Sequence, residues 1–326
     1  MKNKTVNTIP KDIREKNKKL FSIEVKRRLK RDWELYILLV LPIIYLVVFK
    51  FVPIYGVQIA FKDFIAKNGI LDSPWSDPLF KNFTKFLTDY NFFRVMRNTL
   101  SLSLYSLVAG FPLPIIFALS LNYVKHEKFK KTIQLITYAP YFISTVVVVG
   151  IILQLFATRT GLVNHLLVSM NFREVNFLGS SSTFPHLYVW TQVWQTLGFN
   201  SIIYLATLSA IDPSLHEAAV VDGANKIQRM IHIDMPGIMP TAIVLLILNS
   251  GQILNMGFEK VLLMQNSLNM ETSEIISTYV YKLGFKSSLP QYSYSTAVGL
   301  FQSIIGLLLL VTVNQISKKV SDSSLF

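Results

Sequence analysis

Five long stretches without a single Asp, Glu, Lys or Arg most constrain how this chain can fold. They cover residues 98–124, 132–158, 175–211, 235–258 and 287–317. Each contains an apolar segment of the roughly 20 residues that a helix needs to cross a bilayer core about 30 Å thick. A sixth apolar segment, residues 35–57, contains Lys50, whose long side chain can reach the membrane interface. The pattern predicts an all-α, polytopic membrane protein.

The distribution of basic residues predicts the orientation of these spans. The formal net charge is +13, which is also typical of proteins that bind nucleic acid. With the N-terminus in the cytoplasm, however, the inside segments hold 20 Lys and Arg residues and the outside segments hold 11, despite their greater length. Because the charge follows the loops, the positive-inside rule favours six transmembrane helices with both termini inside, and it disfavours a basic nucleic-acid face.

A single transmembrane domain accounts for most of the chain. We expect a basic cytoplasmic N-terminal tail at residues 1–34, a transmembrane domain at residues 35–316 and a cytoplasmic tail at residues 317–326. The expected spans are residues 35–57, 98–122, 133–157, 184–210, 237–257 and 293–316. The long charged leader does not resemble a cleavable signal peptide. Pro112 and Pro114 should kink the second span.

Metal and thiol chemistry are disfavoured by composition. The chain has no cysteine, which excludes disulfides and thiolate metal sites. Its five histidines never recur at a spacing of three or four residues, so no helical metal site is expected.

The cytoplasmic connection between the fourth and fifth spans, residues 212–236, has the pattern of two short helices. Asp212 or Ser214 can cap the first helix, and Ser214 with Glu217 has capping-box spacing. Gly223 can adopt a positive φ and end that helix, after which the chain restarts at residues 226–233. We interpret this loop as a rigid projection for a cytosolic partner.

Specific residues of this loop resemble a known motif. The matching positions are Glu217, Ala218, Ala219, Asp222, Gly223, Ala224, Ile233, Pro236 and Pro240. They are similar to the EAA loop of permease subunits of binding-protein-dependent ABC importers. Family members usually have Phe and Leu where this chain has Met230 and Met235, and these are apolar exchanges.

The resemblance implies the type I ABC importer permease fold, in a bacterial cell membrane. It also implies that the first loop helix is a coupling helix, which docks in a cleft of an ATPase subunit. The expected partners are a second, homologous permease, two ATPase subunits and an extracellular solute-binding lipoprotein. Since no glycine is followed by lysine, the chain has no P-loop and is not expected to be an enzyme. No cofactor is expected in this chain, and ATP and Mg²⁺ would be bound by the ATPase subunits.

The likeness extends over about residues 33–320, including the segments LYILLVLPIIYLVVF and RNTLSLSLYSLVAGFPLP. These segments resemble the first permease of Gram-positive complex-oligosaccharide importers of the maltose type. The resemblance implies import of an oligosaccharide derived from a polysaccharide or glycan, by alternating access.

Polar side chains in two spans are candidates for the substrate path. Asn249, Gln252 and Asn255 recur every three residues and predict one polar stripe on the fifth span. Amides suit sugar hydroxyls because both donate and accept hydrogen bonds. On the fourth span, Trp190 and Trp194 could stack on sugar rings. Gln195 and Asn200 lie close to them in the sequence.

The sequence also allows other interpretations of these polar side chains and of the function of the chain. Amides in membrane helices also hydrogen-bond neighbouring helices, and Trp also occurs in interface belts. An EAA loop is equally compatible with import of another nutrient, such as a peptide or an amino acid. An intramembrane glycosyl-transferring enzyme is the remaining alternative, although its spans should carry carboxylates or histidines, which are scarce here.

Overall fold

The structure is a computed structural model that describes residues 30–254 and 257–320. The chain divides into two compact units, residues 1–58 and 59–326. The described part of the first unit contains α2 (Trp33–Leu46), followed by a π-helical turn (Val47–Phe51) and a 3-10 helix (Val52–Phe61) that leads into the second unit.

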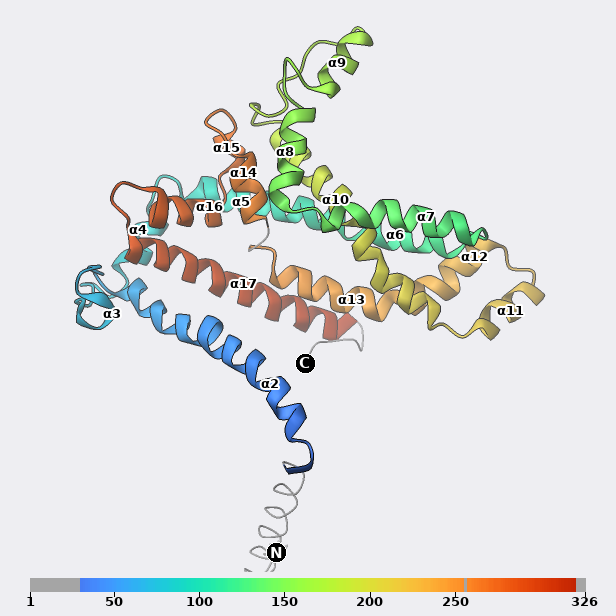
Figure 1. The fold of residues 1–326 in the computed structure, drawn as a ribbon, viewed down its shortest axis with the longest axis horizontal. Coiled ribbons are helices and arrows are strands. Elements are labelled where there is room, and N and C mark those ends of the chain that lie inside the picture. The colour runs from blue at the N-terminus through green and yellow to red at the C-terminus, as the bar shows by residue number, and fades with distance from the viewer. Residues whose placement is uncertain (1–29, 255–256, 321–326) are drawn as a thin grey trace, which may run out of the picture. The chain divides into compact units, whose positions relative to one another are not determined.

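The second unit is also built from helices (Figure 1). They are α3 (Gly69–Asp72), α4 (Lys81–Leu87), α5 (Phe92–Gly110), α6 (Pro112–Asn122), α7 (Glu127–Tyr138), α8 (Thr145–Leu155), α9 (Leu162–Ser169), α10 (Phe184–Ser209), α11 (Pro213–Val221), α12 (Lys226–Arg229), α13 (Met235–Gly251), α14 (Phe258–Met264), α15 (Met270–Ser273), α16 (Ile276–Tyr281) and α17 (Tyr292–Val320). Among the described residues the only β-type pairing is an isolated bridge between Lys62 and Trp75. The expected all-helical architecture is therefore present.

Several of these helices are long and apolar enough to cross a membrane. Within the described ranges they are Trp33–Phe61, Phe92–Asn122, Lys226–Gly251 and Tyr292–Lys319, with the bent pair Glu127–Phe142 and Thr145–Leu155 as a fifth candidate. Helix α10 has 26 residues and a length of about 39 Å, so it is long enough to span, but its amides and hydroxyls make it more polar. The number of spans and their orientation stay predictions.

The third expected span is not one straight helix. Glu127–Phe142 and Thr145–Leu155 meet at 101°. The bend follows Pro140, which has no backbone N–H to continue the helix. Ser144 then caps α8 by accepting the backbone N–H of Val147 at 3.4 Å. In the second span, α5 ends at Gly110 and α6 begins at Pro112, close to where the prolines predicted a kink.

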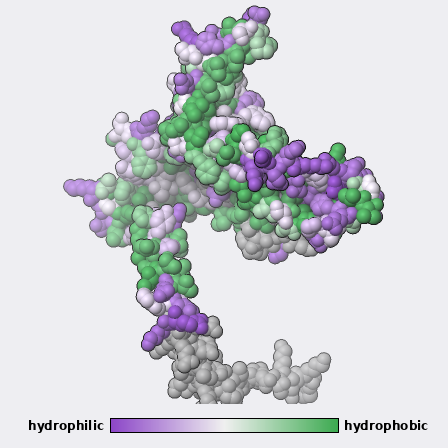
Figure 2. Space-filling model, turned by 45° about the vertical axis from the view of Figure 1, so that its right-hand side comes forward, coloured by the Kyte–Doolittle hydropathy of each residue, from purple (hydrophilic) through white to green (hydrophobic). Residues whose placement is uncertain are grey.

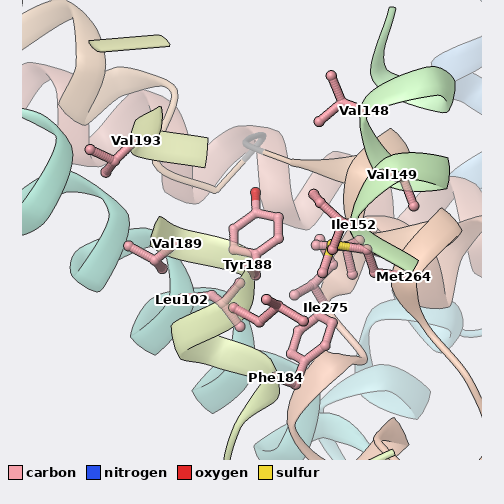
Figure 3. Packing of buried hydrophobic residues seen from close by; sticks show 12 residues of the cluster. Leu102, Val148, Val149, Ile152, Phe184, Tyr188, Val189, Val193, Met264 and Ile275 are labelled. Carbon is pink, nitrogen blue, oxygen red and sulfur yellow. The ribbon is translucent and has the colours of Figure 1, made fainter. Parts of the chain in front are cut away.

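Helix α10 lies at the centre of the packing, in contact with α5, α6, α7 and α13. Towards its C-terminal end it contributes Tyr204 and Leu208 to an apolar cluster with α6 and α13, whose members include Ile115, Ala118 and Ile238. Towards its N-terminal end, Phe184, Tyr188 and Val189 pack with residues of α5, α8 and α14 (Figure 3). The first cluster supports the loop between α10 and α13, and the second supports a polar cleft described below.

Charged residues also tie distant segments together. Glu274, which is almost fully buried, forms ion pairs with Arg94 of α5 and with Lys282, the latter at 3.0 Å. Asn98 donates to the backbone carbonyls of Glu271 and Glu274 at 2.7 and 3.0 Å. These contacts hold the segment around α15 and α16 against α5.

Gly198 offers a test of the packing between α10 and α7. A Cβ atom at Gly198 would lie 2.3 Å from the carbonyl oxygen of Thr137, so a side chain would force the two helix backbones apart. We expect Gly198→Ala to destabilise the protein by about 1–3 kcal/mol and to lower its thermal midpoint in detergent. Gly150→Ala in α8 is the control, because its Cβ would meet nothing within 4 Å. Equal midpoints for the two variants would contradict the close approach.

Candidate functional site

The connection between α10 and α13 forms the first part of the candidate site. It contains α11 and α12, and a π-helical turn (Met230–Asp234) joins α12 to α13. Figure 2 shows hydrophilic side chains gathered towards the right-hand side of the molecule, the side on which α11 and α12 lie in Figure 1. The apolar cluster of α6, α10 and α13 supports the two ends of this connection.

Helix α11 presents side chains that the rest of the described chain does not cover. None of its residues is buried. Val221 is 86% exposed and Leu215 is 53% exposed, and Glu217 is also exposed. An exposed helix with large apolar residues is typical of a surface that binds a partner protein.

The start of α11 follows one of the two expected patterns. The Asp212 carboxylate accepts the backbone N–H of Ser214 at 2.9 Å, and this hydrogen bond lowers the pKa of Asp212. Asp212 is therefore the N-cap, and Ser214 already lies in the first turn. The expected capping box of Ser214 with Glu217 is wrong, because Ser214 would have to be the N-cap to form it.

Gly223 ends the first loop helix as predicted, with φ +82°. A side chain there would meet no atom of this chain within 4 Å, so the backbone conformation rather than crowding favours glycine. A capping box that the sequence analysis missed starts the next helix. In it, Asn225 accepts the N–H of Gln228, and Gln228 accepts the N–H of Asn225.

Four of the six coupling residues predicted from the motif line a hollow of about 320 Å³. They are Ala219, Asp222, Gly223 and Ala224. Glu217 and Ala218 do not line it and are exposed on α11.

A buried carboxylate connects this loop to the end of α6. Asp234 is fully buried. Its Oδ2 accepts the phenol of Tyr123 at 2.6 Å, and its Oδ1 lies 3.2 Å from Nε2 of His216 on α11, in ion-pair geometry. The Arg229 guanidinium lies 5.9 Å from the Tyr123 ring centre. Burial and the contact with Asp234 raise the pKa of Tyr123 to about 12, so the phenol keeps its proton.

The predicted substrate-path residues do not form one site. Trp190 and Trp194 line an apolar pocket of about 480 Å³ together with residues of α8, and the indole N–H of Trp190 donates to Tyr105 at 3.0 Å. Asn200 and Asn249 meet at a small pocket of about 100 Å³ between α6, α10 and α13. Gln252 is exposed and lines none of these pockets, and Asn255 lies outside the described residues.

Gln195 lies at a third location, a polar cleft of about 650 Å³. The cleft is lined by the break between α7 and α8, by α10 and by the start of α14. Its lining residues are Tyr141, Phe142, Ile143, Ser144, Thr145, Gln192, Gln195, Thr196, Gly257, Phe258, Glu259 and Lys260. Gln195 donates weakly to the carbonyl of Ile143 at 3.4 Å. Amides, hydroxyls and aromatic rings in one cleft match the chemistry of a sugar site.

Lys260 is the cleft residue that the sequence analysis missed. Its side chain is buried, its ammonium donates to Oε1 of Gln192 at 3.3 Å, and it lies 5.5 Å from the ring centre of Tyr188. Burial lowers the pKa of Lys260 to about 7.

Gly257 is the N-cap residue of α14, so its backbone conformation helps to position Lys260 in the first turn of that helix. Its φ is +80°, and a Cβ atom would lie 1.8 Å from the Tyr188 hydroxyl. Figure 3 shows that this hydroxyl points away from Phe184 and the apolar residues around it.

Comparison with known proteins decides the family. Residues 110–323, about two thirds of the chain, match the family described as binding-protein-dependent transport system inner membrane component. The chain belongs to this family. The family assignment makes it an integral protein of the inner membrane and a component of a transport system, as the loop motif predicted.

Relatives of this inner membrane component cover nearly its whole length. It is 43% identical over 298 residues to Protein LplB of Bacillus subtilis (strain 168), covering 91% of this chain and 92% of that protein. It is 41% identical to the polygalacturonan/rhamnogalacturonan transport system permease protein YteP of the same organism, covering 90% of each.

Among solved structures it resembles a bacterial ABC transporter involved in the import of the acidic polysaccharide alginate. The TM-score is 0.82 at 36% identity, over 91% of this chain and 99% of that chain. A second structure of an alginate transporter, in complex with an alginate pentasaccharide-bound periplasmic protein, matches equally well.

The buried carboxylate of Asp234 yields a test of the loop anchor. Tyr123→Phe removes the hydroxyl that donates to Asp234 and leaves a buried charge with fewer partners. We expect a loss of about 1.5–3 kcal/mol in stability, measured as a lower thermal midpoint of the purified complex. The control is Tyr90→Phe, because the Tyr90 side chain is 92% exposed. A midpoint for Tyr123→Phe equal to that of the control would show that this hydrogen bond does not hold the loop.

Proposed function

We propose that this chain is a permease subunit of an ATP-driven ABC importer that carries an oligosaccharide into the cell by alternating access. The observation that carries this proposal is a loop with the EAA motif, anchored by a buried carboxylate, in a chain that belongs to the importer family. A second permease, two ATPase subunits and an extracellular solute-binding lipoprotein would complete the transporter.

The oligosaccharide cargo is supported by two independent observations. Permease YteP is described as part of a polygalacturonan/rhamnogalacturonan system, and the matching solved transporter imports alginate. The chain's own cleft is lined by Gln192, Gln195 and Thr196 beside aromatic rings. Amides and hydroxyls suit sugar hydroxyls, because both kinds of group donate and accept hydrogen bonds.

The proposed coupling passes through α11. In this mechanism the exposed Glu217, Leu215 and Val221 contact the ATPase subunit. Closure of the ATPase dimer then moves α11, and the contacts of Asp234 with His216 and Tyr123 carry the movement to α13 and α6. The outward cavity opens for cargo, and hydrolysis returns it to the inward state.

The proposed topology has six spans with both termini in the cytoplasm. The described apolar helices, the long polar α10 and the excess of basic residues in the inside segments support this arrangement. It places α11 and α12 in the cytoplasm, where an ATPase subunit can reach them.

Combined changes in the loop test the coupling. Glu217→Lys with Gly223→Asp reverses the charge of α11 and strains the turn that ends it. We expect transport by reconstituted transporter in vesicles to fall at least about tenfold, with loss of the ATPase activity that loaded binding protein stimulates. A matched control is Glu174→Lys with Gly69→Asp, because Glu174 is exposed and Gly69 has φ +76° with no atom near its Cβ. Transport that survives the loop changes would overturn the coupling mechanism.

Purification of the tagged chain in mild detergent tests the subunit composition. We expect a second permease and an ATPase to co-purify, and we expect ATPase turnover to rise when one oligosaccharide is added with its binding protein. Recovery of the chain without nucleotide-binding partners would contradict the importer assignment. Stimulation by peptides or amino acids alone would refute the oligosaccharide cargo.

A further inference from the structure

Buried charged side chains in the described part of the chain nearly all have a compensating group. Glu274 is paired with Arg94 and Lys282, and Asp234 with His216 and Tyr123. The ammonium group of Lys62 donates to the backbone carbonyls of Ile70 and Leu71 at 2.6 and 3.0 Å. Such pairing is the rule, because an uncompensated charge is costly to bury.

Lys260 departs from this rule. It is as buried as Lys62, with 3% of its surface exposed, yet no carboxylate of the described residues lies within ion-pair distance. Its hydrogen-bond partner among the residues that the structure describes is the neutral amide of Gln192, at 3.3 Å. Glu259 lines the same cleft, but it is exposed and forms no ion pair with Lys260. Among the described residues, only the amide of Gln192 and the ring of Tyr188, whose centre is 5.5 Å away, lie against this ammonium group, so it can still pair with an anion.

The cleft around Lys260 has room for such a group. Its volume of about 650 Å³ accommodates more than one sugar residue. The first turn of α8, at Ser144 and Thr145, also lines the cleft, and the positive end of this helix dipole favours an anion. The amides of Gln192 and Gln195, on α10, line the same cleft, where they can bind hydroxyls beside that anion.

We propose that Lys260 binds an anionic group of the transported oligosaccharide, a carboxylate of a uronate residue, and so makes the importer selective for acidic sugars. The inference rests on the proposed function and assigns the cargo class within it. Binding of the carboxylate supplies the ion pair that Lys260 lacks, and the lowered pKa of the free lysine rises again when the anion is bound.

The test uses the reconstituted transporter with its binding protein and compares uptake of trigalacturonate, trimannuronate, the methyl ester of trigalacturonate, maltotriose and arabinotriose. For the wild type we expect uptake of an acidic sugar. For Lys260→Gln we expect kcat/KM for that sugar to fall by about 10- to 100-fold, with little change for neutral sugars. Lys260→Arg keeps the charge and should keep the preference.

Two control variants separate charge recognition from packing. Lys62→Gln removes an equally buried lysine away from the cleft, and it should leave the ratio of acidic to neutral uptake unchanged. Glu174→Gln removes an exposed acid that does not line the cleft, and it should leave uptake of both acidic and neutral sugars unchanged.

The outcomes distinguish failure of the proposed importer function from failure of the proposed role of Lys260. No uptake of any sugar by the wild type would refute the proposed function itself. Uptake of neutral sugars only, or an unchanged preference in Lys260→Gln, would overturn the role of Lys260 while the importer assignment stands. An equal loss for acidic and neutral sugars would also overturn it, because it would show that Lys260 pairs with a carboxylate of another subunit or only supports the fold.

Discussion

The packing of α10 against α6 and α13 is the interaction on which the functional parts of the structure depend. Tyr204 and Leu208 of α10 are buried with Ile238 of α13, and this cluster fixes the two points between which the loop of α11 and α12 extends. The other half of α10 carries Gln192 and Gln195 to the polar cleft. One helix therefore supports both the surface proposed to receive the ATPase and the cleft proposed to receive cargo. Gln192, Gln195 and Thr196, which are among the polar residues that lower the hydropathy of α10, line the cleft.

Local features of the sequence predicted local features of the structure well. The apolar runs predicted helices, Asp212 was one of two expected caps, and Gly223 has the positive φ that its place after a helix indicated. The Ser214 and Glu217 pair shows the limit of this reasoning, since a capping box depends on which residue is the N-cap, and two residues competed for that position. The 101° bend before α8 could not be predicted from the uncharged run that contains it, because hydropathy carries no information on the direction of the backbone.

Tertiary contacts were beyond prediction from one sequence. Tyr123 and Asp234 are 111 residues apart, and neither has a motif that links it to the other. The three-residue spacing of Asn249 and Gln252 predicted that both lie on one stripe of the same helix. Helix α13 ends at Gly251, however, and Gln252 does not line the small pocket that Asn249 lines. Lys260 was counted among loop charges, where a lysine is normally solvated. Its burial depends on Tyr188 and on the turn at Gly257, and no residue next to it in the sequence indicates that.

The helix that begins at Lys226 runs through the π-helical turn to Gly251 without interruption. Its 26 residues correspond to about 39 Å, a length close to the thickness of a bilayer with its headgroups. This helix contains Pro240, which removes one backbone hydrogen bond from its interior, but the helix continues past it to Gly251. It therefore acts as a lever that links the loop after Gly223 to the residues around Asn249. The extra residue of a π-helical turn shifts the register of side chains along such a lever, so Asp234 can face Tyr123 while the helix axis stays unbroken.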